Sequence, residues 1–229
     1  MVKTSINYNN TKIIFEGLFE NDHIYKQLNL KNNFYELKLL EKIKSLNLTG
    51  TYVDVGANIG NHTVFFSKFC PSDKVISIEL SQNIFNTLKR NVTENNNLLN
   101  VNLINVGVGE KYKTVTISDM DITNVGMTKI TGEGGDIIVD TLDNLLKDET
   151  NISVIKLDVE GYEKNALLGA KEIIKKHSPI IIAELKDDDE FGDFKEIAEE
   201  LGYETDKVNY ASTPTYIWVK KKKNINSYI

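Results

Sequence analysis

The chain has 229 residues, 41% of them hydrophobic, and a formal net charge of −6 at pH 7, which suits one α/β domain with a small N-terminal addition. The acidic balance disfavours broad binding to a nucleic-acid backbone, which needs many lysine and arginine contacts. The single cysteine, Cys70, excludes an intramolecular disulfide and a cysteine-based zinc site. The sequence shows neither an apolar export signal nor an uninterrupted apolar run of about 18 residues, so it predicts a cytoplasmic protein without a membrane span.

The first part of the chain carries weaker patterns than the rest. An apolar run at residues 13–15 predicts a short strand. Apolar residues then recur every third position within residues 34–46, with Lys and Glu between them, which indicates a helix. We therefore expect an N-terminal extension over residues 1–46 beside a main domain over residues 47–223.

The most informative stretch is a β-branched run at residues 52–55 that ends in a glycine-containing turn and is followed by an apolar helical pattern at residues 64–69. Strand, tight turn and helix in this order form the first half of a nucleotide-binding βαβ unit. Gly56 and Gly60 allow the backbone to bend sharply and to approach a ligand closely. Asn58 is the residue type that best tolerates a left-handed conformation where glycine is absent.

The spacing of this turn separates the nucleotide classes. A dinucleotide fingerprint needs glycines at positions 56, 58 and 61, but positions 58 and 61 are both Asn. A Walker loop is excluded because no Gly-Lys-Ser/Thr follows. The pattern D-x-G-x-N-x-G that begins at Asp54 resembles the first motif of class I S-adenosylmethionine (SAM) methyltransferases. In that reading Asp54 helps to hold the SAM ammonium, directly or through water, and the turn amides meet its carboxylate; the alternative is an ordinary strand-helix corner.

A second acid supports a nucleoside ligand. A compact apolar strand ends at Glu79, 23 residues after Gly56, and a carboxylate about 20 residues beyond the first glycine accepts hydrogen bonds from ribose hydroxyls in such folds. The next strand is predicted over residues 101–109. Since its carboxyl end faces the adenine in a doubly wound sheet, Asn105 and Val106 are candidate adenine neighbours.

The other informative stretch is a buried strand at residues 153–157 that leads directly into Asp158 and Glu160 and a glycine turn. Strand carboxyl ends face the ligand crevice in an open α/β sheet, so one of these two acids is our candidate general base. Crowded carboxylates raise each other's pKa toward a useful range. Alternatively, Asp158 and Glu184, with the acids at 187–189, hold a divalent cation; the sequence gives no complete ligand set, and we assign no metal ligand.

Further strands are predicted over residues 113–117, 180–185 and 216–219. A polar, glycine-rich insertion at residues 118–135 has little apolar periodicity and is expected to line the site rather than to build the core. Asn124, Gly126 and Thr128 lie in this insertion.

Residues 53–63 together with residues 155–163 resemble the two principal motifs of the FkbM family of SAM-dependent methyltransferases. Residues 141–143 and 168–170 also match that family's layout, and the resemblance covers about residues 34–219. It implies an α/β, Rossmann-like class I methyltransferase fold with a mostly parallel seven-stranded sheet and an antiparallel last strand. It also implies SAM as the cofactor and methyl transfer to a hydroxyl on a sugar, polyketide or other small metabolite.

The resemblance places the N-terminal extension over the cofactor site. A non-catalytic nucleoside-binding module is disfavoured by the presence of both acids after the buried strand, and a methyltransferase acting on a protein or nucleic acid lacks a visible basic groove or an N/D-P-P-Y/F motif. A small-molecule or carbohydrate acceptor is therefore preferred. The catalytic candidates are Asp158 and Glu160, and the cofactor-binding candidates are Glu36, Asp54, Gly56, Asn58, Gly60, Asn61, His62, Thr63, Glu79, Asn105, Val106 and Asp158.

Overall fold

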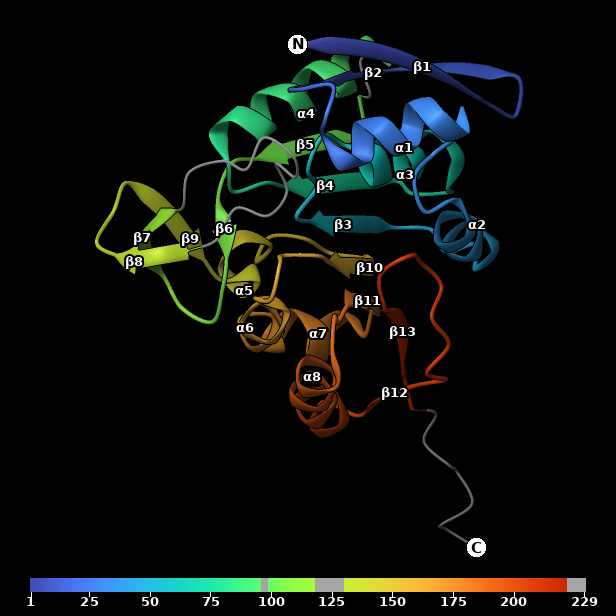
Figure 1. The fold of residues 1–229 in the computed structure, drawn as a ribbon. Coiled ribbons are helices and arrows are strands. Elements are labelled where there is room, and N and C mark those ends of the chain that lie inside the picture. The colour runs from blue at the N-terminus through green and yellow to red at the C-terminus, as the bar shows by residue number, and fades with distance from the viewer. Residues whose placement is uncertain (96–98, 118–129, 222–229) are drawn as a thin grey trace, which may run out of the picture.

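A seven-stranded sheet forms the centre of the molecule (Figure 1). The computed structural model describes residues 1–95, 99–117 and 130–221. Along the sheet the strands lie in the order β12-β13-β11-β10-β3-β4-β5. In chain order they are β3 (Thr51–Val55), β4 (Lys74–Ile78), β5 (Val101–Ile104), β10 (Ile152–Leu157), β11 (Ile180–Glu184), β12 (Tyr203–Thr205) and β13 (Thr215–Lys220).

The direction of the strands confirms the predicted sheet. The five strands β5, β4, β3, β10 and β11 are parallel to one another, whereas β13 runs antiparallel to both of its neighbours, β11 and β12. Parallel strands bring their carboxyl ends to one edge of a sheet, where ligands bind in open α/β folds. The acids that follow β4, β10 and β11 therefore gather at a common edge.

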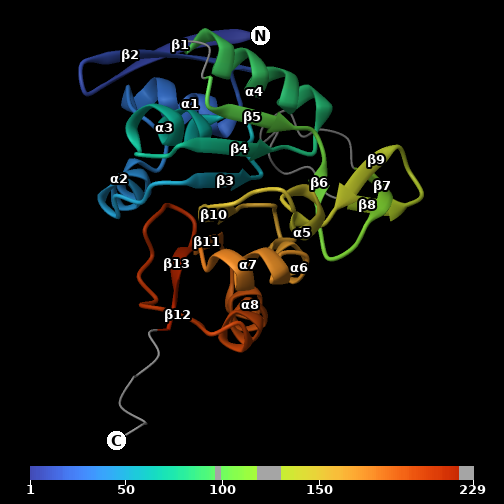
Figure 2. The ribbon, with the colours of Figure 1, turned by 180° about the vertical axis from the view of Figure 1, so that it is seen from behind.

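Each face of the sheet has its own hydrophobic core, as the period of two along a strand requires. Val53 and Ile155 point to the face covered by α5 (Leu142–Leu145), α6 (Glu163–Leu168), α7 (Lys171–His177) and α8 (Asp188–Glu200). Tyr52 and Val154 point to the opposite face, where α3 (Asn61–Phe69) packs together with α2 (Leu37–Ser45) and the N-terminal segment. Figure 2 shows the two sets of helices on opposite sides of the strands.

The N-terminal segment shares this second core. A hairpin of β1 (Val2–Tyr8) and β2 (Thr11–Gly17) precedes α1 (His23–Lys31). The hairpin lies on α4 (Gln82–Glu94), where Asn91 and Asn95 bind both the N–H and the C=O groups of Glu16 and Ile14. These two side chains of α4 thereby satisfy backbone hydrogen-bonding groups on the outer edge of β2, as a neighbouring strand would. The sequence predicted the strand at 13–15 but identified neither β1 nor α1.

The predicted strand over residues 101–109 is interrupted. β5 ends at Ile104, and β6 (Gly107–Val108) pairs instead with β9 (Ile137–Asp140) in a separate small sheet with β7 (Lys113–Ile117) and β8 (Ile130–Glu133). Asn105 causes the break by donating its side-chain N–H groups to the carbonyls of Glu79 and Leu80. Residues 118–129, with Asn124, Gly126 and Thr128, lie outside the described residues.

The apolar pattern after residue 162 forms two helices, α6 and α7, because the chain turns at Gly169. A Cβ atom there would lie 2.0 Å from the carbonyl oxygen of Gly109, so only glycine allows this approach. In the three described ranges of the chain, no helix is both long enough and apolar enough to cross a membrane.

Candidate active site

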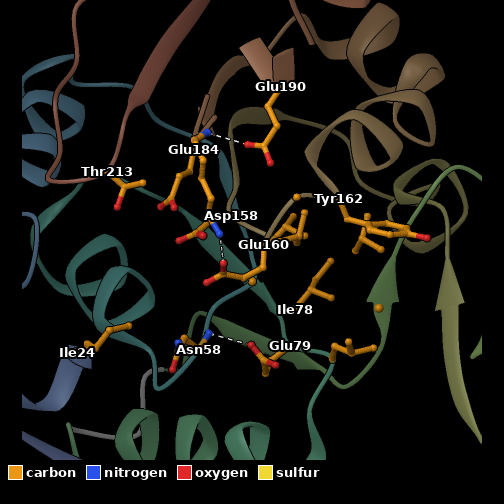
Figure 3. A pocket seen from close by; sticks show the side chains of 18 of the residues that line it. Ile24, Asn58, Ile78, Glu79, Asp158, Glu160, Tyr162, Glu184, Glu190 and Thr213 are labelled. Atoms are coloured by element: carbon orange, nitrogen blue, oxygen red, sulfur yellow. Dashed lines mark hydrogen bonds and ion pairs between the residues drawn. The ribbon is translucent and has the colours of Figure 1, made fainter. Parts of the chain in front are cut away.

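A cavity of about 650 Å³ opens at the carboxyl ends of β3, β4, β10 and β11 (Figure 3). Six of the predicted site residues line it: Gly56, Asn58, Glu79, Val106, Asp158 and Glu160. The rest of the lining is formed by His23, Ile24, Tyr35, Val55, Ile78, Leu80, Gly107, Val108, Val159, Gly161, Tyr162, Glu184, Lys186, Glu190 and Thr213.

The glycine turn after β3 has the geometry that its sequence predicted. Gly56 has φ +76°, and a Cβ atom at this position would lie 1.7 Å from the carbonyl oxygen of Asp158. Asn58 is left-handed with φ 50°, and Gly60 follows with φ 94°. The absence of a side chain at Gly56 therefore brings the two motif loops, after β3 and after β10, into direct backbone contact at the cavity.

Glu79 lies at the far side of this turn. Its Oε2 accepts a hydrogen bond from the Asn58 backbone N–H at 3.0 Å, and its Oε1 accepts one from the Ser81 N–H at 2.8 Å. Burial raises the pKa of Glu79 to about 7, although these two backbone donors favour the ionised form. Each carboxylate oxygen keeps a lone pair free for a further donor, which fits a ligand with two neighbouring hydroxyls.

Asp54 occupies a different place from the one that the motif suggested. Its side chain is fully buried on the α3 side of the sheet and does not line the cavity. Thr63 Oγ1 donates to Asp54 Oδ2 at 2.7 Å, and Lys156 Nζ lies 3.7 Å from Asp54 Oδ1. Asp54 and Thr63 therefore support the turn from beneath, in contact with other protein groups.

Five more candidates lie behind or beside the turn and are not part of the cavity lining. Asn61 exchanges two 3.0 Å hydrogen bonds with the backbone of Tyr35, and His62 Nε2 lies 3.4 Å from Glu36 Oε2. Both side chains of the latter pair are buried. These contacts attach the N-terminal segment to the start of α3. Gly60 packs against Leu88 of α4, and Asn105 binds the Glu79 carbonyl.

Three carboxyl groups meet at the other end of the cavity. Figure 3 shows Asp158 and Glu184 at this end, with Glu160 nearby and with Asn58 and Glu79 opposite. Asp158 Oδ2 accepts a 2.9 Å hydrogen bond from Lys156 Nζ, and Glu160 forms an ion pair with Lys186. Burial and the Asp158 charge raise the pKa of Glu184 well above its ordinary value.

The backbone between Asp158 and the next helix is held by Glu163, which the sequence had not singled out. Its two carboxyl oxygens accept the N–H groups of Val159 at 2.7 Å and Gly161 at 3.0 Å. Burial raises the pKa of Glu163 to about 7. Glu160 lies between Val159 and Gly161 and has a left-handed conformation, with φ 55°. The two hydrogen bonds to Glu163 therefore fix the backbone that carries the Glu160 side chain.

Sequence reasoning missed the residues that reach the cavity from distant segments. His23, Ile24 and Tyr35 come from the N-terminal segment and Thr213 from the loop before β13. The Tyr35 hydroxyl lies 2.9 Å from Ser212 Oγ, which joins these two segments. No local pattern marks such residues, since their proximity arises from packing. Lys156 did leave a signal, because a lysine interrupts an otherwise apolar strand.

The alternative of a metal site has no ligand cluster to support it. In the ranges 1–95, 99–117 and 130–221, no group of three or more His, Cys, Asp or Glu side chains is arranged to hold a metal ion. Asp158 and Glu184 do lie together, but the nearest cation to Asp158 is the ammonium of Lys156.

A family model described as "Methyltransferase FkbM domain" matches residues 54–208, which include both motif loops at the cavity. The chain belongs to the FkbM methyltransferase family. A search of curated proteins found no match for the sequence. The match includes Gly56, Glu79, Asp158 and Glu184, whereas the lining residues His23, Tyr35 and Thr213 lie outside it.

Solved structures confirm the class I methyltransferase fold. Methyltransferase FkbM from Methylobacillus flagellatus KT has 19% identity and a TM-score of 0.55; the match covers 75% of this chain and 44% of that one. Precorrin-6y C5,15-methyltransferase from Geobacter metallireducens GS-15 has 14% identity, a TM-score of 0.50 and coverages of 82% and 87%. M. jannaschii TYW2, solved in complex with AdoMet, has 15% identity, a TM-score of 0.50 and coverages of 95% and 83%. This chain thus spans less than half of the FkbM structure that it matches.

Proposed function

We propose that this FkbM-family chain uses S-adenosyl-L-methionine to methylate a hydroxyl group on a sugar or another small metabolite. One observation carries the proposal: a single cavity joins a glycine turn and Glu79 at one end to Asp158 and Glu184 at the other. The first end suits a nucleoside, and the second suits proton transfer from a hydroxyl. AdoMet in the TYW2 structure and the family assignment support the same cofactor.

The cofactor would lie along the glycine turn. Glu79 would accept hydrogen bonds from the ribose hydroxyls. The backbone N–H groups of Gly56 and Asn58 already bind Ile78 and Glu79, so the half-buried turn would offer its carbonyl oxygens to the SAM ammonium. Leu80 and Val106 supply apolar surface for the adenine. The close contact between Gly56 and the Asp158 carbonyl supports this fit, because any larger residue would fill the space between the two loops.

The cofactor supplies an electrophilic methyl group, and the protein supplies alignment and a proton acceptor. As the acceptor oxygen forms its bond to the methyl carbon, its proton passes to a carboxylate. When bound, SAM would supply the methyl group and a sulfur leaving group that keeps the electrons of the broken carbon–sulfur bond. Asp158 is the preferred base, because the buried Lys156 fixes its position inside the cavity, whereas Glu160 pairs with the partly exposed Lys186.

The charges at this end restrict the acceptor. Asp158, Glu160 and Glu190 line the cavity there with the ammonium of Lys186, and the raised pKa of Glu184 favours its neutral carboxyl form. A phosphate or carboxylate next to these groups would be repelled, whereas hydroxyl and amino groups would find hydrogen-bond acceptors. We therefore propose a hydroxylated acceptor that is neutral or positively charged. The acidic surroundings also disfavour a nucleic-acid substrate.

Calorimetric titration tests the cofactor assignment. SAM and its demethylated product should bind with a stoichiometry of one, and NAD should not bind with comparable affinity. A panel of neutral sugars, amino sugars and sugar phosphates, assayed by release of the demethylated product, then tests the acceptor class. Binding of NAD as tight as that of SAM contradicts the cofactor assignment, and methylation confined to sugar phosphates contradicts the acceptor charge.

A further inference from the structure

Lys156 lies in the middle of the sheet, where burying a charged side chain carries a large desolvation free energy. Its side chain is 3% exposed, and in register its neighbours are Asp54 on β3 and Ile182 on β11. An ammonium group removed from water is stable only when carboxylates and hydrogen bonds replace its hydration. The role of this buried charge can therefore be read from the carboxylates that lie next to it.

Two carboxylates share this ammonium. Lys156 Nζ lies 2.9 Å from Asp158 Oδ2, at the cavity, and 3.7 Å from Asp54 Oδ1, under the glycine turn. Asp54 is held in turn by Thr63, whose Oγ1 lies 2.8 Å from Ser77 Oγ. A continuous buried polar row therefore connects β4 and α3 with the Asp158 carboxylate.

The charges around this row do not balance locally. Asp54, Asp158, Glu36 and Glu184 all act on the single ammonium of Lys156. Burial by itself would lower the pKa of Lys156, but Asp158 and Asp54 more than offset burial and raise it. The other charged or titratable groups that face Asp158 or Glu184 are Tyr35, Glu79, Glu160, Glu163 and Lys186.

The two cavity carboxyls consequently differ. Asp158 has a direct hydrogen bond from Lys156, whereas no side-chain hydrogen bond to Glu184 is found within the described part of the chain. Burial and the neighbouring Asp158 charge shift the pKa of Glu184 upward. The buried Lys156 ammonium therefore acts on Asp158 by direct contact.

We infer that Lys156 is a positioning residue that holds the Asp158 carboxylate fixed at the cavity and stabilises its charge. This rests on the proposed methyl transfer, for which Lys156 orients the proton acceptor. Asp158 accepts the proton of the acceptor hydroxyl, and Glu184 lies beside it as a further hydrogen-bonding group for the ligand. Lys156 itself touches neither ligand.

The test measures protonation directly. Carboxyl carbons of Asp and Glu are labelled with ¹³C and titrated by NMR in the free protein, with Asp158→Asn and Glu184→Gln used to assign the signals. In Lys156→Met, the titration midpoint of Asp158 should move up by about 1–3 pH units, the scale of losing an adjacent opposite charge. Lys156→Arg should retain the original midpoint. An unchanged Asp158 midpoint in folded Lys156→Met overturns the inference.

Lys186→Met is the matched control, because it removes the other cavity ammonium, which pairs with Glu160. It should shift the midpoint of Glu160 more than that of Asp158; an equal shift of Asp158 contradicts a specific role for Lys156. Should Lys156→Met fail to fold, Asp54→Asn combined with Lys156→Met removes both buried charges of that pair and leaves Asp158 to be titrated.

Calorimetry with SAM on the same preparations separates this inference from the proposed function. If the unmodified chain does not bind SAM, the proposed function fails, and the titration of Asp158 still decides the role of Lys156. If SAM binds normally and Asp158 titrates identically with and without Lys156, the inference alone fails.

Discussion

The two ends of the cavity are built by different means. At the glycine turn, Gly56 and Asn58 form the surface, and the conformations of both follow from their own residue types. At the acidic end, side chains from separate strands create the surface, and the buried Lys156 ammonium holds Asp158 by a hydrogen bond. A surface formed by the backbone of a turn is thus determined by the residue types of that turn. A surface formed by charged side chains depends on the register between strands that are distant in sequence.

The largest effect is expected from Gly56→Ala, which should disrupt the packing of the glycine turn against the loop after β10. A Cβ atom would overlap the Asp158 carbonyl at 1.7 Å, and φ is +76°. We expect a loss of at least about 3 kcal/mol in the free energy of unfolding, or roughly 10 °C in the thermal midpoint. Gly134→Ala is the matched control: φ there is +83°, but nothing lies within 4 Å, so the cost should stay near 1–2 kcal/mol. Similar losses in both variants would contradict the steric explanation.

Asp158→Asn tests the acidic end with little change of shape. Turnover per folded molecule on an identified acceptor should fall by roughly 10²-fold or more, the scale of losing a general base. The thermal midpoint should also fall, because the buried Lys156 ammonium loses its nearest carboxylate. Glu160→Gln should reduce turnover less, because Lys186 already engages Glu160. Both quantities are measured on the same preparations. An early-melting Asp158→Asn with an unchanged rate per folded molecule would indicate a purely structural acid.

Glu79 tests whether the turn end also depends on charge. Glu79→Ala should weaken SAM binding by roughly 1–3 kcal/mol, the cost of lost hydrogen bonds to a carboxylate. The pKa of Glu79 is raised to about 7, and hydroxyl donors favour its ionised form. The affinity for SAM should therefore fall as the pH drops below about 7, by up to tenfold per unit, and level off above it. A pH-independent affinity would contradict the ribose assignment.

The same group predicts the pH dependence of the ligand-free protein. Between the ordinary glutamate pKa of 4.5 and the raised pKa of about 7, the native state binds more protons at Glu79 than the unfolded chain does. The contribution of Glu79 to the free energy of unfolding must then fall as the pH rises through this window. Urea denaturation at pH 5 and pH 8, with and without Glu79→Gln, measures this slope; a slope of opposite sign in the difference between the two proteins contradicts it.

The smallest effect on SAM binding is expected from Asn91→Ala, which loosens the contact between the N-terminal hairpin and α4. The Asn91 side chain accepts a hydrogen bond from the Glu16 N–H and donates one to the Glu16 carbonyl. It also donates to the Ile59 carbonyl in the glycine turn at 2.7 Å. Its loss should lower the free energy of unfolding by about 1–3 kcal/mol and weaken SAM binding slightly. Asn86→Ala, an exposed position on the same helix, should change neither quantity measurably.

The sequence by itself determined the local architecture. The β-branched run and the glycines predicted the strand, turn and helix at the first motif, and the structure places Asn58 in the left-handed conformation that its residue type favours. The sequence also placed Glu79 and Asp158 at strand ends, and both line the cavity. Such features are predictable because backbone conformation and period-two alternation depend on neighbours in the chain.

Only the tertiary structure decided which groups meet. Asp54 was expected at the ligand, but its strand position turns it toward α3, where Lys156, 102 residues away in sequence, is its register partner. Tyr35 and Thr213 reach the cavity from opposite ends of the chain. Strand pairing and helix packing place these side chains, and a charge finds its partner through that packing rather than through sequence spacing.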